Sequence, residues 1–517
     1  VNKLNEINPL SYHTAISSTE WDAAKLQIKL NISGFKRSLT ENQINNLKKL
    51  APLPAGATFS VPGAGKTTEA LAYFFVNKKP EDKLLVVAPK NAFGAWEEQI
   101  VECTGNNQPQ FVRLRGGRDA IDRILQDNPE LSIITYQQYA RVTDIIKAFL
   151  IRNHVFMFLD ESHRIKSGLQ GVTPEAILSC SYLPIRKLIM SGTPMPQSVN
   201  DLIPQFMFLY PDYTVDTKNV VSAIQPIYVR TTAEKLGLPK MERKTIVLSM
   251  TPLQMEVYHS IKSAIKRELM PMLSDSSKFS LRELGKRIIK VMQYVSNPGL
   301  LASDLDYIFD SKMGETLAKN DGVKIEYACK RAIELASQNK KVIIWTQFVR
   351  NVEIISERLK FLGADFIHGQ VDAGSEKEED TREWKIKEFH SNPQKMVLVA
   401  NPAAASEGIS LHKICQNAIY VDRSFNAAHY LQSEDRIHRL GLKPDQHPEV
   451  EILECRGTID QLIDQRLKKK VDLMSRSLND SSLCIDTIHY DMDIDADEII
   501  NEDDIEEIKK YFEDDNQ

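Results

Sequence analysis

The sequence predicts an α/β protein with two doubly wound parallel-sheet lobes, joined by a helical linker and followed by an acidic C-terminal tail. Short, continuously apolar runs such as residues 83–89 and 155–160 support this, because strands buried on both faces are typical of parallel sheets. Helical stretches separate the runs, as in a doubly wound fold. The alternation stops near residue 245 and resumes near residue 341, so two such sheets are expected within 517 residues.

The first lobe begins near residue 39. A helix is expected over residues 41–50, and a second helix over residues 68–75 follows a short strand. Further upstream, apolar and polar residues alternate between residues 26 and 32, which predicts a short strand without an assigned role. The apolar runs expected to form the first sheet are residues 57–61, 83–89, 131–135, 155–160 and 187–191.

Residues 245–320 have a different pattern, with apolar residues at helical spacing and few β-branched runs, so helices are expected there. The second sheet is predicted from apolar runs at residues 341–345, 364–367, 395–400, 418–421 and 450–453. The expected domains are an N-terminal extension (1–36), a first lobe (37–230), a linker with a helical insertion (231–322), a second lobe (323–470) and the acidic tail (471–517).

The composition is typical of a soluble globular protein, with 42% hydrophobic and 26% charged residues. No apolar run reaches the length of a membrane span, and no basic and then apolar leader opens the sequence. An intracellular protein, cytoplasmic or nucleoid-associated, is therefore expected. The six cysteines form no CxxC pair, which favours reduced thiols over a cysteine zinc site or a disulfide framework.

The net charge of −5 is concentrated near the end, in residues 491–498 and 501–507. Without this tail the remainder is basic, and clusters of lysine and arginine such as residues 113–118 and 262–267 are able to neutralise phosphates. Each cluster taken alone is more often a solvated helix face.

A phosphate-binding loop is indicated by Ser60 to Thr67, which reads Ser-Val-Pro-Gly-Ala-Gly-Lys-Thr. Glycines let backbone N–H groups approach phosphate oxygens, while a lysine reaches the β and γ phosphates and a hydroxyl binds Mg²⁺. Lys66 and Thr67 fill the last two roles. Ser60 stands where the pattern has its first glycine, and the strand before the loop and the helix after it give the context that the motif requires.

Polar residues also follow two later strands of the first lobe. Asp160 and Glu161 come at the end of a buried strand, at the carboxyl edge where ligands bind in open α/β sheets. An aspartate there can hold Mg²⁺, and a glutamate beside it can orient or deprotonate the attacking water. Residues 191–194, Ser-Gly-Thr-Pro, are candidates to sense the γ-phosphate; a plain turn is the alternative.

Near the end of the chain, Arg436 and Arg439 lie three residues apart on an expected helix, hence on one face. Arginines that a second domain offers to a nucleotide stabilise charge on the transferred phosphoryl group. An Arg-x-x-Arg helix taken alone is usually surface. The expectation is one ATP site in two halves, residues 60–67 and 432–439.

As an ordered set, these motifs resemble helicase superfamily two and, within it, the Swi/Snf branch of double-stranded-DNA translocating ATPases. The branch is indicated by Leu238-Pro239-Lys240 and by Met250-Thr251-Pro252-Leu253-Gln254, which are similar to the Swi/Snf linker. The resemblance covers residues 37–475. The sequence departs from the family pattern at Ser60, Ser162 and Leu442, and in a short connection after Pro211.

The resemblance implies RecA-like folds for both lobes, with ATP and Mg²⁺ as cofactors. The predicted catalytic residues are Glu161, Lys66, Arg436 and Arg439, and the predicted metal ligands are Thr67 and Asp160. The predicted nucleotide-binding residues are Gln43, Gly63, Ala64, Gly65, Lys66, Thr67, Gly408 and Gln432. The predicted contacts with nucleic acid are Lys90, Thr135, Tyr136 and Ser406.

The leading interpretation is a DNA-dependent ATPase, a monomeric motor that translocates on duplex DNA and remodels or displaces bound protein or nucleic acid. Two alternatives stay open: a strand-separating DNA or RNA helicase, and a nucleotide-gated DNA clamp. The linker offers no recognisable aromatic platform for separating bases, which favours translocation without unwinding. A targeting protein is a possible partner and a membrane is not expected. The acidic tail is either a solvated, partly disordered end or a phosphate mimic that rests in the DNA groove.

Overall fold

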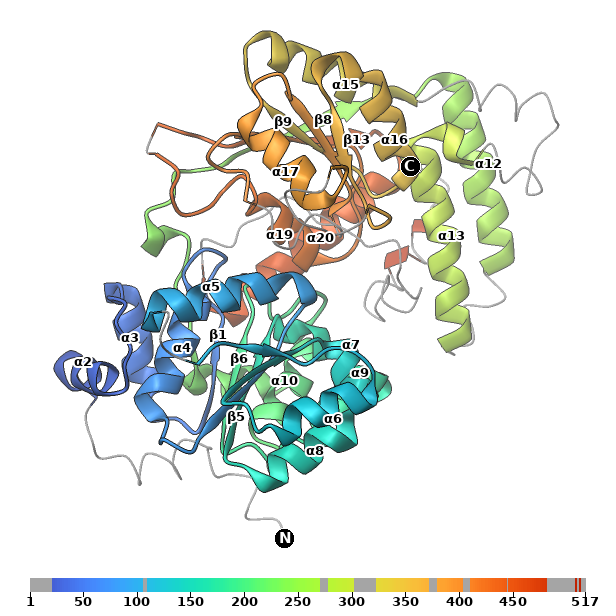
Figure 1. Cartoon of the computed structure of the whole chain (residues 1–517). Helices are drawn as coiled ribbons and strands as arrows, with labels where there is room; N and C mark the ends of the chain where they lie inside the picture. Colours follow the sequence, from blue (N-terminus) through green and yellow to red (C-terminus); the bar gives the residue numbers. More distant parts are fainter. Residues whose placement is uncertain are drawn as a thin grey trace. The chain divides into compact units, whose positions relative to one another are not determined.

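The computed structural model of the chain contains two compact units (Figure 1). We call Val1–Gly237 with Leu473–Leu483 the first lobe, and Leu238–Asp472 with Cys484–Gln517 the second lobe. The residues that the structure describes are 21–105, 109–269, 278–301, 322–371, 379–402, 410–443, 445–480, 507–508 and 511–512.

The segment expected as a short strand upstream of the first lobe is helix α2, Ala23–Ile32. Leu26 and Leu30 lie one helical turn apart and are buried, whereas Ile28 and Ile32 are 59% and 82% exposed. Apolar residues at every second position also satisfy the four-residue spacing of a helix. A strand would bury all four side chains on one face, whereas a helix buries only Leu26 and Leu30, as observed. The strand prediction was therefore wrong.

The first lobe contains a seven-stranded parallel sheet in the order β3-β4-β2-β5-β6-β1-β7. The central strands are buried almost throughout, as their continuously apolar sequences predicted. The strands are β1 Ala55–Thr58, β2 Lys83–Val87, β3 Val112–Arg113, β4 Leu131–Ile134, β5 Val155–Asp160, β6 Arg186–Met190 and β7 Tyr228–Val229.

Helices cover this sheet in two groups, as a doubly wound fold requires (Figure 1). Helix α4 packs against α2, α3 and α5, whereas α9 packs against α7 and α10. The helices that follow α2 in this lobe are α3 Glu41–Leu50, α4 Lys66–Asn77, α5 Phe93–Thr104, α6 Arg118–Gln126, α7 Tyr136–Arg141, α8 Thr143–Arg152, α9 Val172–Leu178, α10 Leu202–Leu209 and α11 Val220–Ile224.

The last segment of the first lobe comes from much later in the chain. Residues after Asp472, including the end of helix α20, Ile459–Ser477, belong to this lobe. Asp480 accepts a 2.6 Å hydrogen bond from Nε of Arg230, which directly follows β7, and both side chains are almost completely buried. The predicted start of the tail at residue 471 therefore falls inside a helix, and the chain beyond that helix is tied to the first sheet.

The second lobe contains a six-stranded parallel sheet in the order β10-β11-β9-β12-β13-β8. Five of its strands confirm the predicted apolar runs. These strands are β9 Val342–Trp345, β10 Asp365–Ile367, β11 Val397–Ala400, β12 Asn417–Tyr420 and β13 Glu449–Cys455.

The sixth strand, β8, Glu242–Leu248, lies inside the segment predicted to be linker and helical insertion. It pairs in parallel with all of β13, from Glu242 opposite Glu449 to Leu248 opposite Cys455. As an edge strand it is charged and largely exposed, so it lacks the continuous apolar run by which the other strands are recognised. The chain thus enters the second sheet before the helices of the insertion.

Helices α12 and α13 of the insertion pack against each other, as the helical spacing of residues 245–320 predicted. No helix among the described residues is long and apolar enough to span a bilayer. The helices of the second lobe are α12 Pro252–Leu269, α13 Lys278–Ser296, α15 Gly322–Ser337, α16 Val349–Arg358, α17 Arg382–Ser391, α19 Ala427–Glu434 and the first part of α20.

Four residues near the C-terminus are described, and they pack on the second lobe. Ile508 and Phe512 are buried, at 0% and 1% exposure. Glu507 accepts a 3.0 Å hydrogen bond from Lys469 in α20, and the Tyr511 ring lies 4.2 Å from Nζ of Lys262 in α12. For these residues the hypothesis of a solvated end is wrong, because apolar side chains anchor them; residues 481–506 of the tail lie outside the described part of the chain.

Replacing Asp480 by Ala should lower the free energy of unfolding of the first lobe by about 3 kcal/mol, because Arg230 would keep a buried charge without its partner. Chemical denaturation followed by circular dichroism measures this. The control is Glu357→Ala, which removes an exposed ion pair with Lys360 and should cost less than about 1 kcal/mol. Equal losses in the two variants would show that Asp480 is not an energetic anchor.

Candidate active site

Three loops meet at the carboxyl edge of the first sheet. Strand β6 lies between β5 and β1, so the ends of three parallel strands are side by side although they are far apart in sequence. The loop after β1 and the loop after β6 touch: a Cβ atom on Gly192 would lie 2.9 Å from the Pro62 ring and 3.7 Å from Nζ of Lys66. The structure thus brings the predicted phosphate loop and residues 191–194 together.

The phosphate loop has the backbone geometry for which the motif needs glycine. Gly63 and Gly65 have φ angles of 84° and 80°, in the left-handed region that other residues rarely adopt. Gly65 is also at the start of α4, and a Cβ atom there would lie 2.4 Å from Nε2 of Gln43. Ala64, between the two glycines, is partly exposed at the tip of the loop. Backbone freedom and close packing together exclude a side chain at Gly65.

Gln43, the predicted adenine-contacting residue, lies against this loop. It is the third residue of α3, where it forms a capping box with Thr40. Its Nε2 donates a 3.2 Å hydrogen bond to the carbonyl of Gly65, and the side chain is 6% exposed. The structure therefore joins Gln43 to the phosphate loop, while its contact with adenine stays a prediction.

Lys66 and Thr67 are the first two residues of α4. Their position gives the loop the positive end of a helix dipole, which favours anions. Nζ of Lys66 donates a 2.9 Å hydrogen bond to the carbonyl of Ser60, at the start of the same loop. The lysine is thus held within the loop that would surround the phosphates.

The departure at Ser60 has a structural reason. Its side chain is 1% exposed, and its hydroxyl accepts a 2.9 Å hydrogen bond from the backbone N–H of Thr231. Thr231 follows β7, so the serine fastens the phosphate loop to the neighbouring edge strand. A glycine at this position would lack the bond.

Asp160, the predicted metal ligand, is held in place by two aromatic residues. Nε1 of Trp96 donates a 2.9 Å hydrogen bond to Oδ2 of Asp160, and the hydroxyl of Tyr136 donates a 2.7 Å hydrogen bond to its backbone carbonyl. Glu161 beside it has a φ angle of 51°, which is unfavourable for a non-glycine residue. Such strained conformations are concentrated at functional sites.

His163 connects Glu161 to the loop after β6. Its Nδ1 lies 3.4 Å from Oε2 of Glu161 and 3.0 Å from the hydroxyl of Ser191. That hydroxyl also accepts a 3.1 Å hydrogen bond from the backbone N–H of Thr193. The predicted water-orienting residue and the predicted phosphate-sensing loop are therefore linked through one ring nitrogen.

The departure at Ser162 is explained in the same way. The serine is fully buried, and its hydroxyl donates a 2.7 Å hydrogen bond to Oε1 of Gln205 in α10. Nε2 of Gln205 donates to the carbonyl of Pro194 at 2.7 Å. The serine thus joins the residues after β5 to those after β6 through a helix.

Sequence reasoning missed a buried polar cluster beneath the phosphate loop. Glu69, in the first turn of α4, is 2% exposed and accepts a 2.7 Å hydrogen bond from Nδ2 of Asn46. Burial raises the pKa of Glu69 to about 7, although hydrogen bonds from Thr58 and Asn46 and the charge of Lys66 act in the opposite direction. The sequence signal that could have revealed this cluster is the glutamate three residues after the lysine of the phosphate loop.

The predicted nucleic-acid contacts are placed differently from one another. Lys90 is exposed just after β2, and Thr135 caps α7 just after β4, on the neighbouring strand. Tyr136 is 2% exposed and hydrogen-bonded to Asp160, so its side chain supports the strand end instead of presenting a surface. The prediction that Tyr136 contacts nucleic acid directly is corrected on this ground. Ser406 and Gly408 lie outside the described residues.

In the second lobe, the predicted arginine helix ends too early. Helix α19 stops at Glu434, so Arg436 lies in the turn that follows and Arg439 lies beyond that turn, and the two do not share a helical face. Arg436 is 8% exposed and its Nε donates a 2.9 Å hydrogen bond to the carbonyl of Gln432. Gln432 is also buried, at 5% exposure. Arg439 is partly exposed.

The unexpected strand β8 supports this turn. Arg243 in β8 donates two hydrogen bonds to the carboxylate of Glu434, at 2.7 and 2.9 Å. Nε2 of His438 lies 2.7 Å from the carbonyl of Pro239, just before β8. The residues around Arg436 are thus fixed by a strand that the sequence pattern did not reveal.

Two family models match the chain: the SNF2-related domain over residues 59–220, within the first lobe, and the helicase conserved C-terminal domain over residues 323–441, within the second. The chain is 25% identical over 450 residues to the ISWI chromatin-remodeling complex ATPase ISW2 of Saccharomyces cerevisiae, with 80% of this chain and 38% of that protein covered.

It is 23% identical over 480 residues to the SWI/SNF-related matrix-associated actin-dependent regulator of chromatin subfamily A member 1 of Homo sapiens, with 85% and 42% covered. The chain therefore spans less than half of the length of these two relatives. Among solved structures, it is similar to the Sulfolobus solfataricus SWI2/SNF2 ATPase core in complex with dsDNA, with 21% identity, a TM-score of 0.37, and 87% of this chain and 95% of that chain covered.

Replacing Glu69 by Gln should stabilise the protein above neutral pH. The pKa of Glu69 is raised from 4.5 to about 7 in the folded state, so ionisation favours unfolding, and this cost grows from pH 4.5 to pH 7 and is then constant. The expected gain at pH 8 is on the order of 3 kcal/mol, and it should shrink as the pH falls toward 5.

Thermal unfolding in EDTA, without nucleotide, measures the difference at each pH. The control is Glu98→Gln, on the exposed face of α5, which should change stability little at any pH. A gain for the Glu69 variant that does not depend on pH would contradict the raised pKa.

Proposed function

We propose that the chain is a Swi/Snf-family ATPase of helicase superfamily two, which hydrolyses ATP to translocate along duplex DNA and to displace protein or nucleic acid bound there. The observation that carries the proposal is the connection within the first lobe from the phosphate loop to Glu161, His163 and Ser191. This connection gives a route by which a change at the γ-phosphate reaches the loops at the edge of the sheet.

The nucleotide binds at the start of α4. The backbone N–H groups around Gly63 and Gly65 and the helix dipole receive the phosphates, and Lys66 moves from the Ser60 carbonyl to a phosphate oxygen. Glu161, held in a strained conformation beside His163, orients the attacking water and accepts its proton.

The hydroxyl of Thr67 and the carboxylate of Asp160 are oxygen donors, which fit a hard cation such as Mg²⁺. The hydrogen bond from Trp96 leaves further acceptor positions on the Asp160 carboxylate. When bound, Mg²⁺ neutralises charge that develops on the phosphates. Trp96 keeps the carboxylate oriented toward that role.

DNA contacts in the first lobe come from the same edge of the sheet. Lys90 follows β2 and Thr135 follows β4, while β2 also neighbours β5, which ends at Asp160. A lysine and a helix-capping threonine are groups that bind phosphate oxygens without reading base sequence. Binding is therefore nonspecific and weakens steeply with salt.

The second lobe supplies Arg436 and Arg439 to the transferred phosphoryl group when ATP is bound. Arg243 holds Glu434 at the end of α19, and Nε of Arg436 donates to the carbonyl of Gln432, so the segment that leads to Arg439 is held in place within the second lobe. Loss of the phosphoryl group removes their ligand, and this couples hydrolysis to movement between the lobes.

ATP hydrolysis by the full chain should rise severalfold when duplex DNA is added, and the stimulation should fall with increasing salt. Glu161→Gln should lower the DNA-stimulated kcat by about 10² to 10⁴ because the water loses its base, while ATP binding is kept. A coupled phosphate-release assay measures both, with Glu98→Gln as the matched control. Hydrolysis that no nucleic acid stimulates would refute the motor.

Replacing Arg439 by Ala should spare ATP binding and lower kcat by about 10³ or more, as expected for an arginine that acts on the transferred phosphoryl group. Fluorescent-nucleotide titration and steady-state kinetics separate the two effects. The control is Arg350→Ala, an exposed arginine of α16 that pairs with Glu353. Unchanged turnover in the Arg439 variant would mean that the second lobe does not complete the site.

Displacement of a third strand from a DNA triplex distinguishes a translocating motor from a clamp that uses hydrolysis only as a timer. A motor clears the third strand in an ATP-dependent reaction, and the Glu161→Gln variant does not. Unwinding of a forked duplex would instead indicate a strand-separating helicase.

A further inference from the structure

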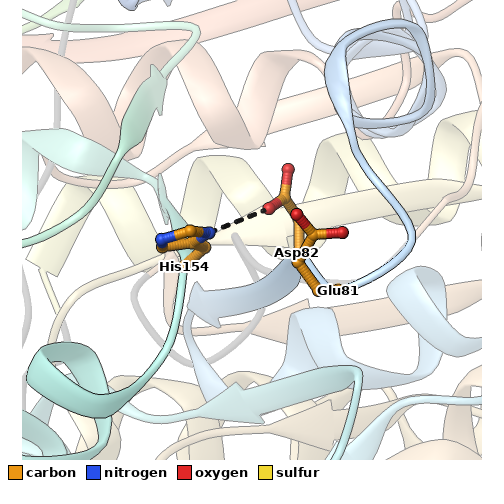
Figure 2. A group of neighbouring side chains, drawn as sticks. All are labelled: Glu81, Asp82 and His154. Carbon is orange, nitrogen blue, oxygen red and sulfur yellow. Dashed lines mark ion pairs between the residues drawn. The ribbon is translucent and has the colours of Figure 1, made fainter.

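A group of side chains that carry metal-ligand atoms, Glu81, Asp82 and His154, lies at the opposite, amino edge of the first sheet (Figure 2). Glu81 and Asp82 directly precede β2, and His154 directly precedes β5. These strands are neighbours, and the backbone N–H of Lys83 donates a 2.9 Å hydrogen bond to the carbonyl of His154. One oxygen from each carboxylate and one nitrogen of the imidazole all lie within 4.8 Å of one another.

The carboxylate of Asp82 gives the main evidence for a cation at this point. Its side chain is 3% exposed, and Oδ2 accepts a 2.9 Å hydrogen bond from the backbone N–H of Lys79. The other oxygen, Oδ1, is buried and has no hydrogen-bond partner in the described part of the chain. It points toward Nδ1 of His154, 3.8 Å away, which is too far for a hydrogen bond. A buried carboxylate oxygen without a partner costs free energy, which a cation at this point would recover.

His154 alone is a poor partner for this oxygen. The imidazole is 62% exposed, and it offers a positive charge only when it is protonated. The nearby ammonium group of Lys83 is engaged elsewhere, because its Nζ donates a 3.0 Å hydrogen bond to the carbonyl of Asn128. The cluster therefore offers carboxylate oxygens from two residues and one imidazole nitrogen.

We propose that Glu81, Asp82 and His154 bind a divalent transition-metal ion, for which Zn²⁺ is the best match. An imidazole nitrogen with carboxylate oxygens is a donor set of Zn²⁺ and its neighbours, whereas Mg²⁺ and Ca²⁺ take oxygen ligands. Zn²⁺ accepts three protein ligands and keeps water in the remaining position. Small rotations of the exposed Glu81 and His154 side chains bring all three donors to one ion.

This site is separate from the nucleotide site. His154 precedes β5 and Asp160 ends it, so a strand of six residues, about 20 Å long, lies between them. A metal ion at the amino edge would join the residues that directly precede two central strands, β2 and β5. The ion would stabilise β5 at its first end, whereas Asp160 and the nucleotide site lie at the other end of the strand.

Calorimetric titration of Zn²⁺ into the full chain tests the proposal, after EDTA treatment and with Mg²⁺ in excess and no nucleotide. The wild type should show one saturable site. His154→Ala and Asp82→Asn should each weaken Zn²⁺ binding by about tenfold or more. Glu81→Gln should weaken it as well. The control is His447→Ala, an exposed histidine of the second lobe, which should bind Zn²⁺ as the wild type does.

Folding is checked separately by circular dichroism of the metal-free variants. Glu81 and His154 are exposed, so their variants keep the fold even if Asp82→Asn does not. Zn²⁺ should raise the Tm of the wild type and leave that of His154→Ala unchanged. If the wild type bound no Zn²⁺, or if it and the His154 variant bound Zn²⁺ equally, the cluster would be a surface ion pair only and the proposal would be overturned.

Discussion

The parallel pairing of β5, β6 and β1 is the constraint on which the chemistry of the first lobe depends. Three neighbouring parallel strands end at one edge, so the segments that follow them converge although more than a hundred residues separate the first from the last. This strand pairing alone brings together the phosphate loop, the Asp160–Glu161 pair and the loop after β6. The parallel pairing of β2 with β5 likewise brings Asp82 and His154 together at the other edge.

Convergence of polar loops at a packed edge creates a second requirement, that their buried groups be paired. Ser60, Ser162 and Asp160 meet it through Thr231, Gln205 and Trp96, of which the first follows an edge strand and the other two lie in helices of the same lobe. The two serines that depart from the family pattern in this lobe are therefore explained by hydrogen bonds that glycine or alanine could not make. Whether serine is accepted at these two positions therefore depends on the hydrogen-bond partners that surround the loops.

The sequence was sufficient to predict the central strands and the phosphate loop, because burial on both faces and the need for positive φ angles leave strong local signals. It was not sufficient for α2, where four apolar residues satisfy both periods, or for β8, whose charged edge-strand sequence resembles a linker. The end of α19 before Arg436 was missed because the Arg243–Glu434 pair that shapes it joins residues far apart in the chain. The partners of Ser60 and Glu69 were hidden for the same reason.

The position of Asp480 has a consequence for how the protein is made. The ribosome completes the strand that precedes Arg230 long before it reaches Asp480, and the whole second sheet is synthesised in between. Until Asp480 has been synthesised, the Arg230 guanidinium lacks this carboxylate as its ion-pair partner. The first lobe is thus completed only after the second sheet has been synthesised, and its Arg230–Asp480 ion pair is a late contact.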